Sequence, residues 1–181
     1  ELAVRKPDLA HDLRGLQVAI EALLRRGASA TKQIPSGATP LHTAAIGGDK
    51  KTIDLLCKAG GNVTALNADK RTALHNCGIT GNAKAAAALI QQGAAVDGAD
   101  AEGCTPLMRA VMKNQAEVAK VLLSNGANPD VIVRTTDTPL FPLFVAAMNG
   151  YTEKDWREFV FFSANVQHLL GIHQLDIQQN L

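Results

Sequence analysis

Two histidines recur in the same short sequence motif, and histidine is the side chain that most readily transfers protons near neutral pH. His42 is the last residue of a Thr-Pro-Leu-His motif, and His75 is the last residue of a Thr-Ala-Leu-His motif farther along the chain. The next copy, at the same interval again, has Met108 in this position, and the last copy has Phe144. Because methionine and phenylalanine cannot accept a proton, the pattern favours a packing role for the histidines and not a catalytic one.

The cysteines and a second pair of histidines lack the spacing of a metal site. Cys57, Cys77 and Cys104 show no paired spacing for zinc. His168 and His173 are five residues apart and would not share a helix face well. We expect Cys57 and Cys77 to be buried, whereas Cys104 lies in a predicted hairpin and is either exposed or, as we favour, inert. No Gly-rich phosphate loop or Gly-x-Ser-x-Gly turn is present, so we predict no catalytic residue, no metal and no cofactor.

Composition excludes several classes of partner. Of the 181 residues 46% are hydrophobic, and the net charge is +1 with lysine and arginine scattered along the chain. This pattern predicts neither nucleic-acid binding nor membrane attachment, and no apolar run approaches the ~18 residues of a membrane-spanning helix. The odd cysteine count favours a reducing compartment, so we expect an intracellular, cytoplasmic protein. We expect a monomer or, because the chain opens on Glu1, a part of a longer chain.

The histidine motif belongs to a longer repeated unit. The interval from position 42 to position 75 is 33, and the same interval links Leu23, Leu56, Leu89 and Leu122, and also Gly27, Gly60, Gly93 and Gly126. This unit resembles the ankyrin repeat, in which a Thr-Pro-Leu-His turn opens the first of two short helices. The resemblance covers about residues 6–160. It implies an all-α solenoid of about five helix-turn-helix repeats, with connecting β-hairpin loops and degenerate terminal caps.

The resemblance divides the chain into three parts. Residues 1–32 are expected to form a degenerate N-terminal capping repeat, with Gly15 separating its two helices. Residues 33–140 are expected to hold three ankyrin-like repeats with hairpins. Residues 141–181 are expected to form a divergent C-terminal repeat and aromatic capping helices.

Three positions depart from the repeat pattern. Lys70 occupies the hairpin position that Gly103 fills one repeat later, so a positive φ there carries a steric penalty of about 1 kcal/mol. Asn114 replaces the glycine between the two helices, and asparagine is the commonest non-glycine residue in that conformation. The last repeat has two registers, with the turn opening at Thr138 or, as we favour, at Phe141.

The resemblance also implies where a partner binds. Members of the family usually meet their partners on the concave side, which the hairpin tips and the first helices form. An apolar row is expected there at Ile46, Ile79, Met112 and Met148, flanked by Thr43, Asn76, Arg109 and Val145. Arg109 is the charged member and is expected to orient an acidic or carbonyl group. Contacts from the hairpin tips are expected at Ser36, Asp69, Arg71 and Glu102. The alternative is that neighbouring hairpins cover about half of each side chain, and that the row only packs.

A second surface competes with the apolar row. All the aromatic residues of the chain lie between positions 141 and 162. They form either a cap on the end of the stack or a docking surface with Trp156, Phe161 and Phe162 as anchors.

These observations predict a non-catalytic module that binds a partner protein or peptide on its concave helix and hairpin face. The alternative is a targeting or regulatory domain of a larger enzyme or effector, docking through its aromatic C-terminal end. The identity of the partner is not written in these residues.

Overall fold

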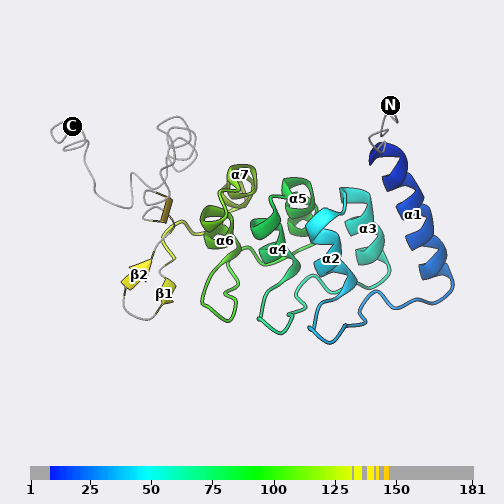
Figure 1. Ribbon diagram of the computed structural model, residues 1–181, viewed down its shortest axis with the longest axis horizontal. Helices are drawn as coiled ribbons and strands as arrows, with labels where there is room; N and C mark the ends of the chain where they lie inside the picture. The colour runs from blue at the N-terminus through cyan, green and yellow to red at the C-terminus, as the bar shows by residue number, and fades with distance from the viewer. Residues whose placement is uncertain (1–8, 132, 136–137, 141, 143–144, 147–181) are drawn as a thin grey trace, which may run out of the picture.

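The computed structural model describes residues 9–131, 133–135, 138–140, 142 and 145–146. Within this part of the chain, pairs of helices alternate with long loops that project on one side of the molecule (Figure 1). The elements are α1 (Leu9–Arg25), α2 (Pro40–Gly47), α3 (Lys50–Lys58), α4 (Ala73–Thr80), α5 (Ala83–Gln91), α6 (Pro106–Met112), α7 (Ala116–Ser124), β1 (Val133–Thr135) and β2 (Thr138–Leu140).

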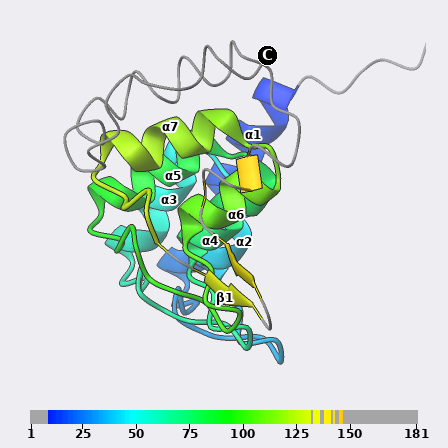
Figure 2. The ribbon, with the colours of Figure 1, turned by 90° about the vertical axis from the view of Figure 1, so that its left-hand side faces the viewer.

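The helices form two rows, as the view along the stack shows (Figure 2). In the inner row α2 packs against α4, and α4 packs against α6. In the outer row α1, α3, α5 and α7 pack in the same sequential order, and each inner helix also contacts the outer helix that follows it. This arrangement confirms the predicted all-α solenoid of helix-turn-helix repeats.

Local sequence explains where the helices begin. Thr39, Thr72 and Thr105 are the extended N-cap residues of the inner helices, and Pro40 occupies a first helical position, where no N–H is needed. The outer helix α3 begins after Asp49, whose Oδ1 accepts a hydrogen bond of 2.9 Å from the Thr52 N–H. The repeat made of α2 and α3 therefore carries start signals for both of its helices.

The two predicted positions of positive φ are confirmed. Lys70 and Asn114 both have φ of 55°, in the left-handed region that side chains other than glycine rarely adopt. Gly37 and Gly103 have φ of 74° and 76° at the hairpin position equivalent to Lys70. The hairpin geometry therefore persists where its usual glycine is absent.

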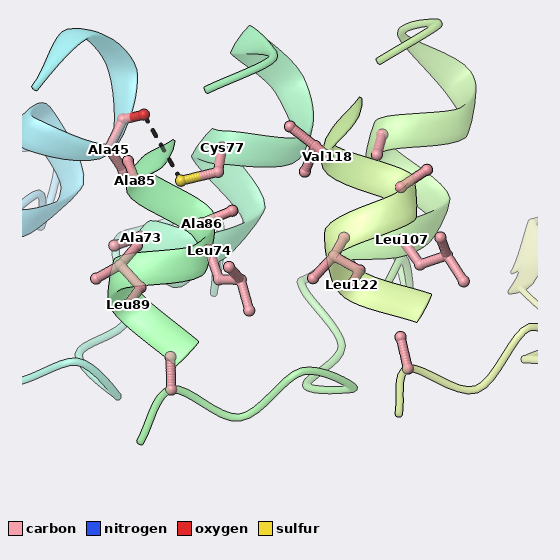
Figure 3. Close-up of a cluster of buried hydrophobic side chains, with 14 of the residues drawn as sticks. Ala45, Ala73, Leu74, Cys77, Ala85, Ala86, Leu89, Leu107, Val118 and Leu122 are labelled. Carbon is pink, nitrogen blue, oxygen red and sulfur yellow. Dashed lines mark hydrogen bonds between the residues drawn. The ribbon is translucent and has the colours of Figure 1, made fainter. Parts of the chain in front are cut away.

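The core lies between the two rows (Figure 3). Leucines from both rows are fully buried, among them Leu74 and Leu107 of the inner helices and Leu89 of the outer row. Small residues let neighbouring helices approach closely: a Cβ added at Gly78 would lie 2.6 Å from the carbonyl oxygen of Pro106. The distance between α4 and α6 therefore depends on the absence of a side chain at position 78.

At the N-terminal end, one prediction was wrong. The chain does not turn at Gly15, because α1 runs as a single 17-residue helix through that position. A glycine inside a helix costs only about 1 kcal/mol relative to alanine, so it permits a break without requiring one. Where α2 has the small pair Ala44 and Ala45, the first repeat has the bulky polar residues His11 and Asp12, which do not suit a closely packed inner helix.

At the other end, a short antiparallel hairpin decides between the two registers of the last repeat. β1 pairs with β2, and Arg134 lies opposite Pro139. Because Pro139 is in a strand, the helix cannot open at Thr138. Pro142, Val145 and Ala146 are helical, which agrees with the register that opens at Phe141.

Candidate partner-binding surface

The three hairpins that lead into the inner helices are joined by backbone hydrogen bonds. The N–H of Ala68 donates to the carbonyl of Ser36 at 2.9 Å, and the N–H of Ala101 donates to the carbonyl of Asp69 at 2.8 Å. Each bond links one tip to the next, so the tips form a continuous edge along the stack. A partner that touches this edge meets a surface whose shape is set before binding.

The two recurring histidines connect each layer to the next hairpin. Nδ1 of His42 accepts a hydrogen bond from the N–H of Thr39 at 3.1 Å, so the proton resides on Nε2. Nε2 then donates to the carbonyl of Arg71 at 2.9 Å. His75 makes the equivalent bonds to the Thr72 N–H and the Cys104 carbonyl, each at 3.1 Å.

Both histidines are therefore buried structural residues that need a neutral ring. Burial lowers the pKa of His75 below its usual value, and its bond to the Cys104 carbonyl only partly opposes this effect. A protonated ring would also place a second N–H against the N–H of Thr72, where an acceptor is required.

Asp100 organises the hairpin that leads into α6. Its Oδ1 accepts hydrogen bonds from the N–H groups of Glu102 and Cys104, both at 3.0 Å. Its Oδ2 accepts from Nε of Arg109 at 2.7 Å and from Nε of Arg71 at 3.3 Å. Burial raises the pKa of Asp100, but the bonds from Arg109 and from the two N–H groups outweigh it and hold this pKa below its usual value.

Arg109 does not present a free cation, which corrects the expectation for this residue. Its side chain is only 7% exposed, and Nη2 lies 2.9 Å from Oε1 of Glu102. That contact is an ion pair without the alignment of a good hydrogen bond. With Asp100 and Glu102 already beside it, the guanidinium is occupied within the fold and positions the hairpin instead of receiving a partner's carboxylate.

The apolar row is partly exposed in the part of the chain that the structure describes. We use this term for Ile46, Ile79 and Met112, which occupy the same position in three successive repeats. Ile46 is 53% exposed and Met112 is 41% exposed, whereas Ile79 is half-buried. Met148, predicted as the fourth member, lies outside the described residues. Ile46 and Met112 are therefore accessible to a partner, whereas Ile79 is partly covered.

The flanking residues differ among themselves. Thr43 is exposed, and Asn76 is half-buried, where its Nδ2 donates to the carbonyl of His42 at 3.1 Å. Val145 is a buried member of the hydrophobic core, so it does not flank an open surface. Of the four predicted flanking residues, only Thr43 and Asn76 are open to a partner.

The hairpin tips present carboxylates. We call Ser36, Asp69 and Glu102 the tip row, because they too occupy one position in three successive repeats. Ser36 is exposed, and the side chains of Asp69 and Glu102 are 60% and 57% exposed. Arg71 is only 21% exposed and contacts Asp69 and Glu102, at 3.2 and 3.0 Å.

Arg109 shows that the two rows belong to one surface. It precedes Met112 by three residues in α6, so both side chains lie on the same helix face. From that face the guanidinium reaches Glu102 of the tip row. We call the surface made of the apolar row and the tip row the inner face.

Sequence reasoning missed Asp100, although a signal was present. Asn67 stands one period before it, and its Oδ1 accepts from the N–H groups of Asp69 and Arg71 at 3.0 and 2.9 Å. The recurrence of Asn or Asp at this position, two residues before a tip, is typical of a side chain that caps its own turn.

The thiols are not arranged for chemistry. Cys77 is buried, and burial raises its pKa to about 12. Cys104 is buried as well, in the folded base of its hairpin, and burial raises its pKa. This confirms the inert interpretation of Cys104. Cys57, which the repeat pattern predicts to be buried, is only half-buried.

Two kinds of site are absent from the described residues. No group of three or more histidine, cysteine, aspartate or glutamate side chains in that part of the chain could hold a metal ion. None of its helices has both the length and the apolarity needed to cross a membrane. Trp156, Phe161 and Phe162 of the aromatic segment lie outside the described residues.

Comparison with known proteins gave a match to a family. A family model described as ankyrin repeats in three copies matches residues 12–96 and 51–133. None of the curated proteins compared with the chain matches it. The matched ranges contain all three hairpins and every residue of the apolar row and the tip row.

Proposed function

The chain belongs to the ankyrin-repeat family, and from this premise we propose that it binds a partner protein or peptide on its inner face without catalysing a reaction. Domains of this family generally act as protein–protein interaction modules. The observation that carries the proposal is the apolar row: three apolar side chains at one position of successive repeats, two exposed and one half-buried, beside an edge of hydrogen-bonded hairpin tips.

Estimates of the binding free energy indicate that a partner must contact both rows. Complete burial of an aliphatic side chain contributes about 1.5–3 kcal/mol, so three that are already half covered contribute about 2–5 kcal/mol. Association itself costs roughly 4–15 kcal/mol. The apolar row alone would therefore bind weakly, and polar contacts to the tip row must supply the remainder.

The structure changes which residues should be tested. Ile46 and Met112 are the most exposed members of the apolar row. Substituting Arg109 would disturb the buried ion pairs with Asp100 and Glu102. It is therefore a poor probe of binding, because lost affinity and lost structure could not be separated.

The test compares capture of partners by the wild type and by Ile46→Asp/Met112→Asp. The matched control is Ala59→Asp/Ala95→Asp, which adds the same two charges at exposed positions after the outer helices α3 and α5. We expect loss of partners only in the first variant, with circular dichroism unchanged in both. Retention of every partner by the first variant would overturn the proposal.

A third variant, Phe161→Asp/Phe162→Asp, tests the alternative of a targeting or regulatory domain that docks through its aromatic end. Loss of partners in this variant alone would favour that alternative over the inner face. For the location, we propose the inside of the cell, since the thiols of Cys57, Cys77 and Cys104 are unpaired.

A further inference from the structure

We infer that the inner face takes an amphipathic α-helix of the partner, with apolar residues seven apart and a basic flank. The inference rests on the proposed function and specifies the kind of partner. It depends on three properties of the inner face: the spacing of the apolar row, the distance between the two rows, and the sign of the exposed charge.

The spacing of the apolar row matches a helix better than a strand. Its members occupy successive helices of the inner row, and packed helices lie about 8–10 Å apart. In a partner helix, residues seven apart share a face and are separated by about 10.5 Å. In an extended strand, residues on one face recur at about 6.7 or 13.4 Å, so they fall between the positions of the apolar row. A helix of about 15 residues spans all three positions.

The inner helices that separate the two rows are about as long as one helix is wide. Ile79 lies in the last turn of α4, whereas the tip row belongs to the hairpins that precede the inner helices. The eight residues of α4 extend about 12 Å, and a helix with its side chains is about 10–12 Å across. A single helix laid across α2, α4 and α6 therefore reaches the apolar row with one side and the tip row with the other.

The exposed charge of the tip row is negative. Arg71 and Arg109 are 21% and 7% exposed and face inward, whereas Asp69 and Glu102 are more than half exposed. Within the tip row the carboxylates are thus the charges that a partner meets, one layer apart, and the exposed cation Lys70 lies next to Asp69 in the sequence. Lysine or arginine residues seven apart on one flank of the partner helix would face them.

Lys70 supplies a test of this sign. It is an exposed cation next to Asp69 in the sequence, and its φ of 55° is a conformation that glycine adopts without strain. Substituting glycine removes a positive charge beside the tip row while keeping the hairpin geometry. A basic helix should then bind more tightly.

The experiment selects displayed random peptides on the wild-type protein and, separately, on Ile46→Asp/Met112→Asp. The peptides are about 21 residues long, which allows a helix of about 30 Å. We expect peptides enriched on the wild type to carry apolar residues seven apart and a net positive charge, and to become helical on binding. Enriched peptides with alternating apolar residues, or with a net negative charge, would overturn this inference and leave the proposed function standing. Equal enrichment on both proteins would overturn the proposed function as well.

The affinity of one enriched peptide, measured by fluorescence anisotropy, then tests the charge. Asp69→Asn should weaken binding about two- to five-fold, as expected for one exposed ion pair. Lys70→Gly should strengthen it, and Glu117→Gln, an exposed carboxylate on the outer helix α7, should leave it unchanged. Tighter binding by Asp69→Asn, or an effect of Glu117→Gln equal to that of Asp69→Asn, would contradict the basic flank.

Discussion

The hairpin that leads into α2 and the hairpin that leads into α6 share one backbone pattern but not their side chains. In the first, the N–H of Ile34 donates to the carbonyl of Ala38 at 3.0 Å; in the second, the N–H of Asp100 donates to the carbonyl of Cys104 at 2.9 Å. Ile34 is largely exposed, whereas the side chain of Asp100 is fully buried among two N–H groups and two guanidinium groups.

The difference separates what shapes a hairpin from what stiffens it. Gly37 and Gly103 have nearly the same positive φ, and with the backbone hydrogen bonds they are enough to form the loop. Asp100 then ties its own loop to α6 through Arg109 and to the neighbouring hairpin through Arg71. We therefore expect the edge of tips to be stiffest beside α6 and loosest beside α2.

The largest effect is expected from Asp100→Ala. It leaves the buried guanidinium of Arg109 without its main partner and two N–H groups without an acceptor, at a cost of about 3–5 kcal/mol. Ile34→Ala, at the equivalent exposed position, should cost about 0.5 kcal/mol. Urea unfolding measures both free energies, and equal losses would contradict the comparison. Asp100→Asn keeps the acceptor for the N–H groups, so its loss of stability should lie between those of Asp100→Ala and Ile34→Ala.

Next in size is Gly78→Ala, which tests whether the stiff hairpin depends on the position of α6. The added Cβ would meet the backbone at Pro106 and Ala110, so α6 must move away from α4, at about 1–3 kcal/mol. Gly98→Ala, where a Cβ meets nothing within 4 Å, is the control and should change stability by about 0.5 kcal/mol or less. A harmless Gly78→Ala would show that the layers tolerate wider spacing.

A smaller effect is expected from pH. His75 donates to the hairpin before α6, whereas the position one period before His42 holds Leu9, which has no donor for the hairpin before α2. Because the pKa of His75 is lower in the folded chain, the unfolded chain takes up the proton first as pH falls below about 6.5.

Stability should therefore decrease as pH falls through that value. Part of this slope should be absent from His75→Met, which introduces the residue found at position 108 one period later. Urea unfolding at several pH values between about 7.5 and 5.5 measures the slope for each protein. Parallel slopes in the two proteins would contradict the role given to His75.

The smallest effect is expected from Gly15→Ala, at the loose end of the stack. If α1 is continuous, alanine at this position should stabilise the protein by about 0.5–1 kcal/mol. Gly81→Ala is the contrasting variant: Gly81 has φ of 84°, and a Cβ there would collide with the Gln115 side chain, so stability should fall. Thermal unfolding distinguishes the two outcomes. A loss of stability in Gly15→Ala would indicate that the chain turns at this residue.

Much of the fold could be predicted from the sequence because each repeat specifies itself locally. The Thr-Pro starts, the turn positions and the buried leucines recur with the period, and even Lys70 and Asn114 adopt the conformation of the glycines they replace. The continuity of α1 could not be predicted in this way. It depends on whether an inner helix carrying His11 and Asp12 would pack, and the period does not contain that information.

The inner face was predictable only in part. The exposure of Ile46 and Met112 follows from their position in the repeat, so one repeat predicts the next. The burial of Arg109 does not follow, because it requires Asp100 and Glu102 on a separate hairpin to approach it. The ion pairs join Arg109 to two residues of another segment, so a sequence analysis that considers one position at a time cannot find them.

The hydrogen bonds of the two histidines also bear on how much of the chain unfolds cooperatively. His42 and His75 join three consecutive layers, while Leu9 and Met108 have no hydrogen to donate at the outer boundaries. We therefore expect the layers from α2 to α7 to unfold as a single cooperative unit, with a weaker junction on each side. The same layers carry the apolar row, so the residues that would bind a partner belong to the part of the chain that unfolds together.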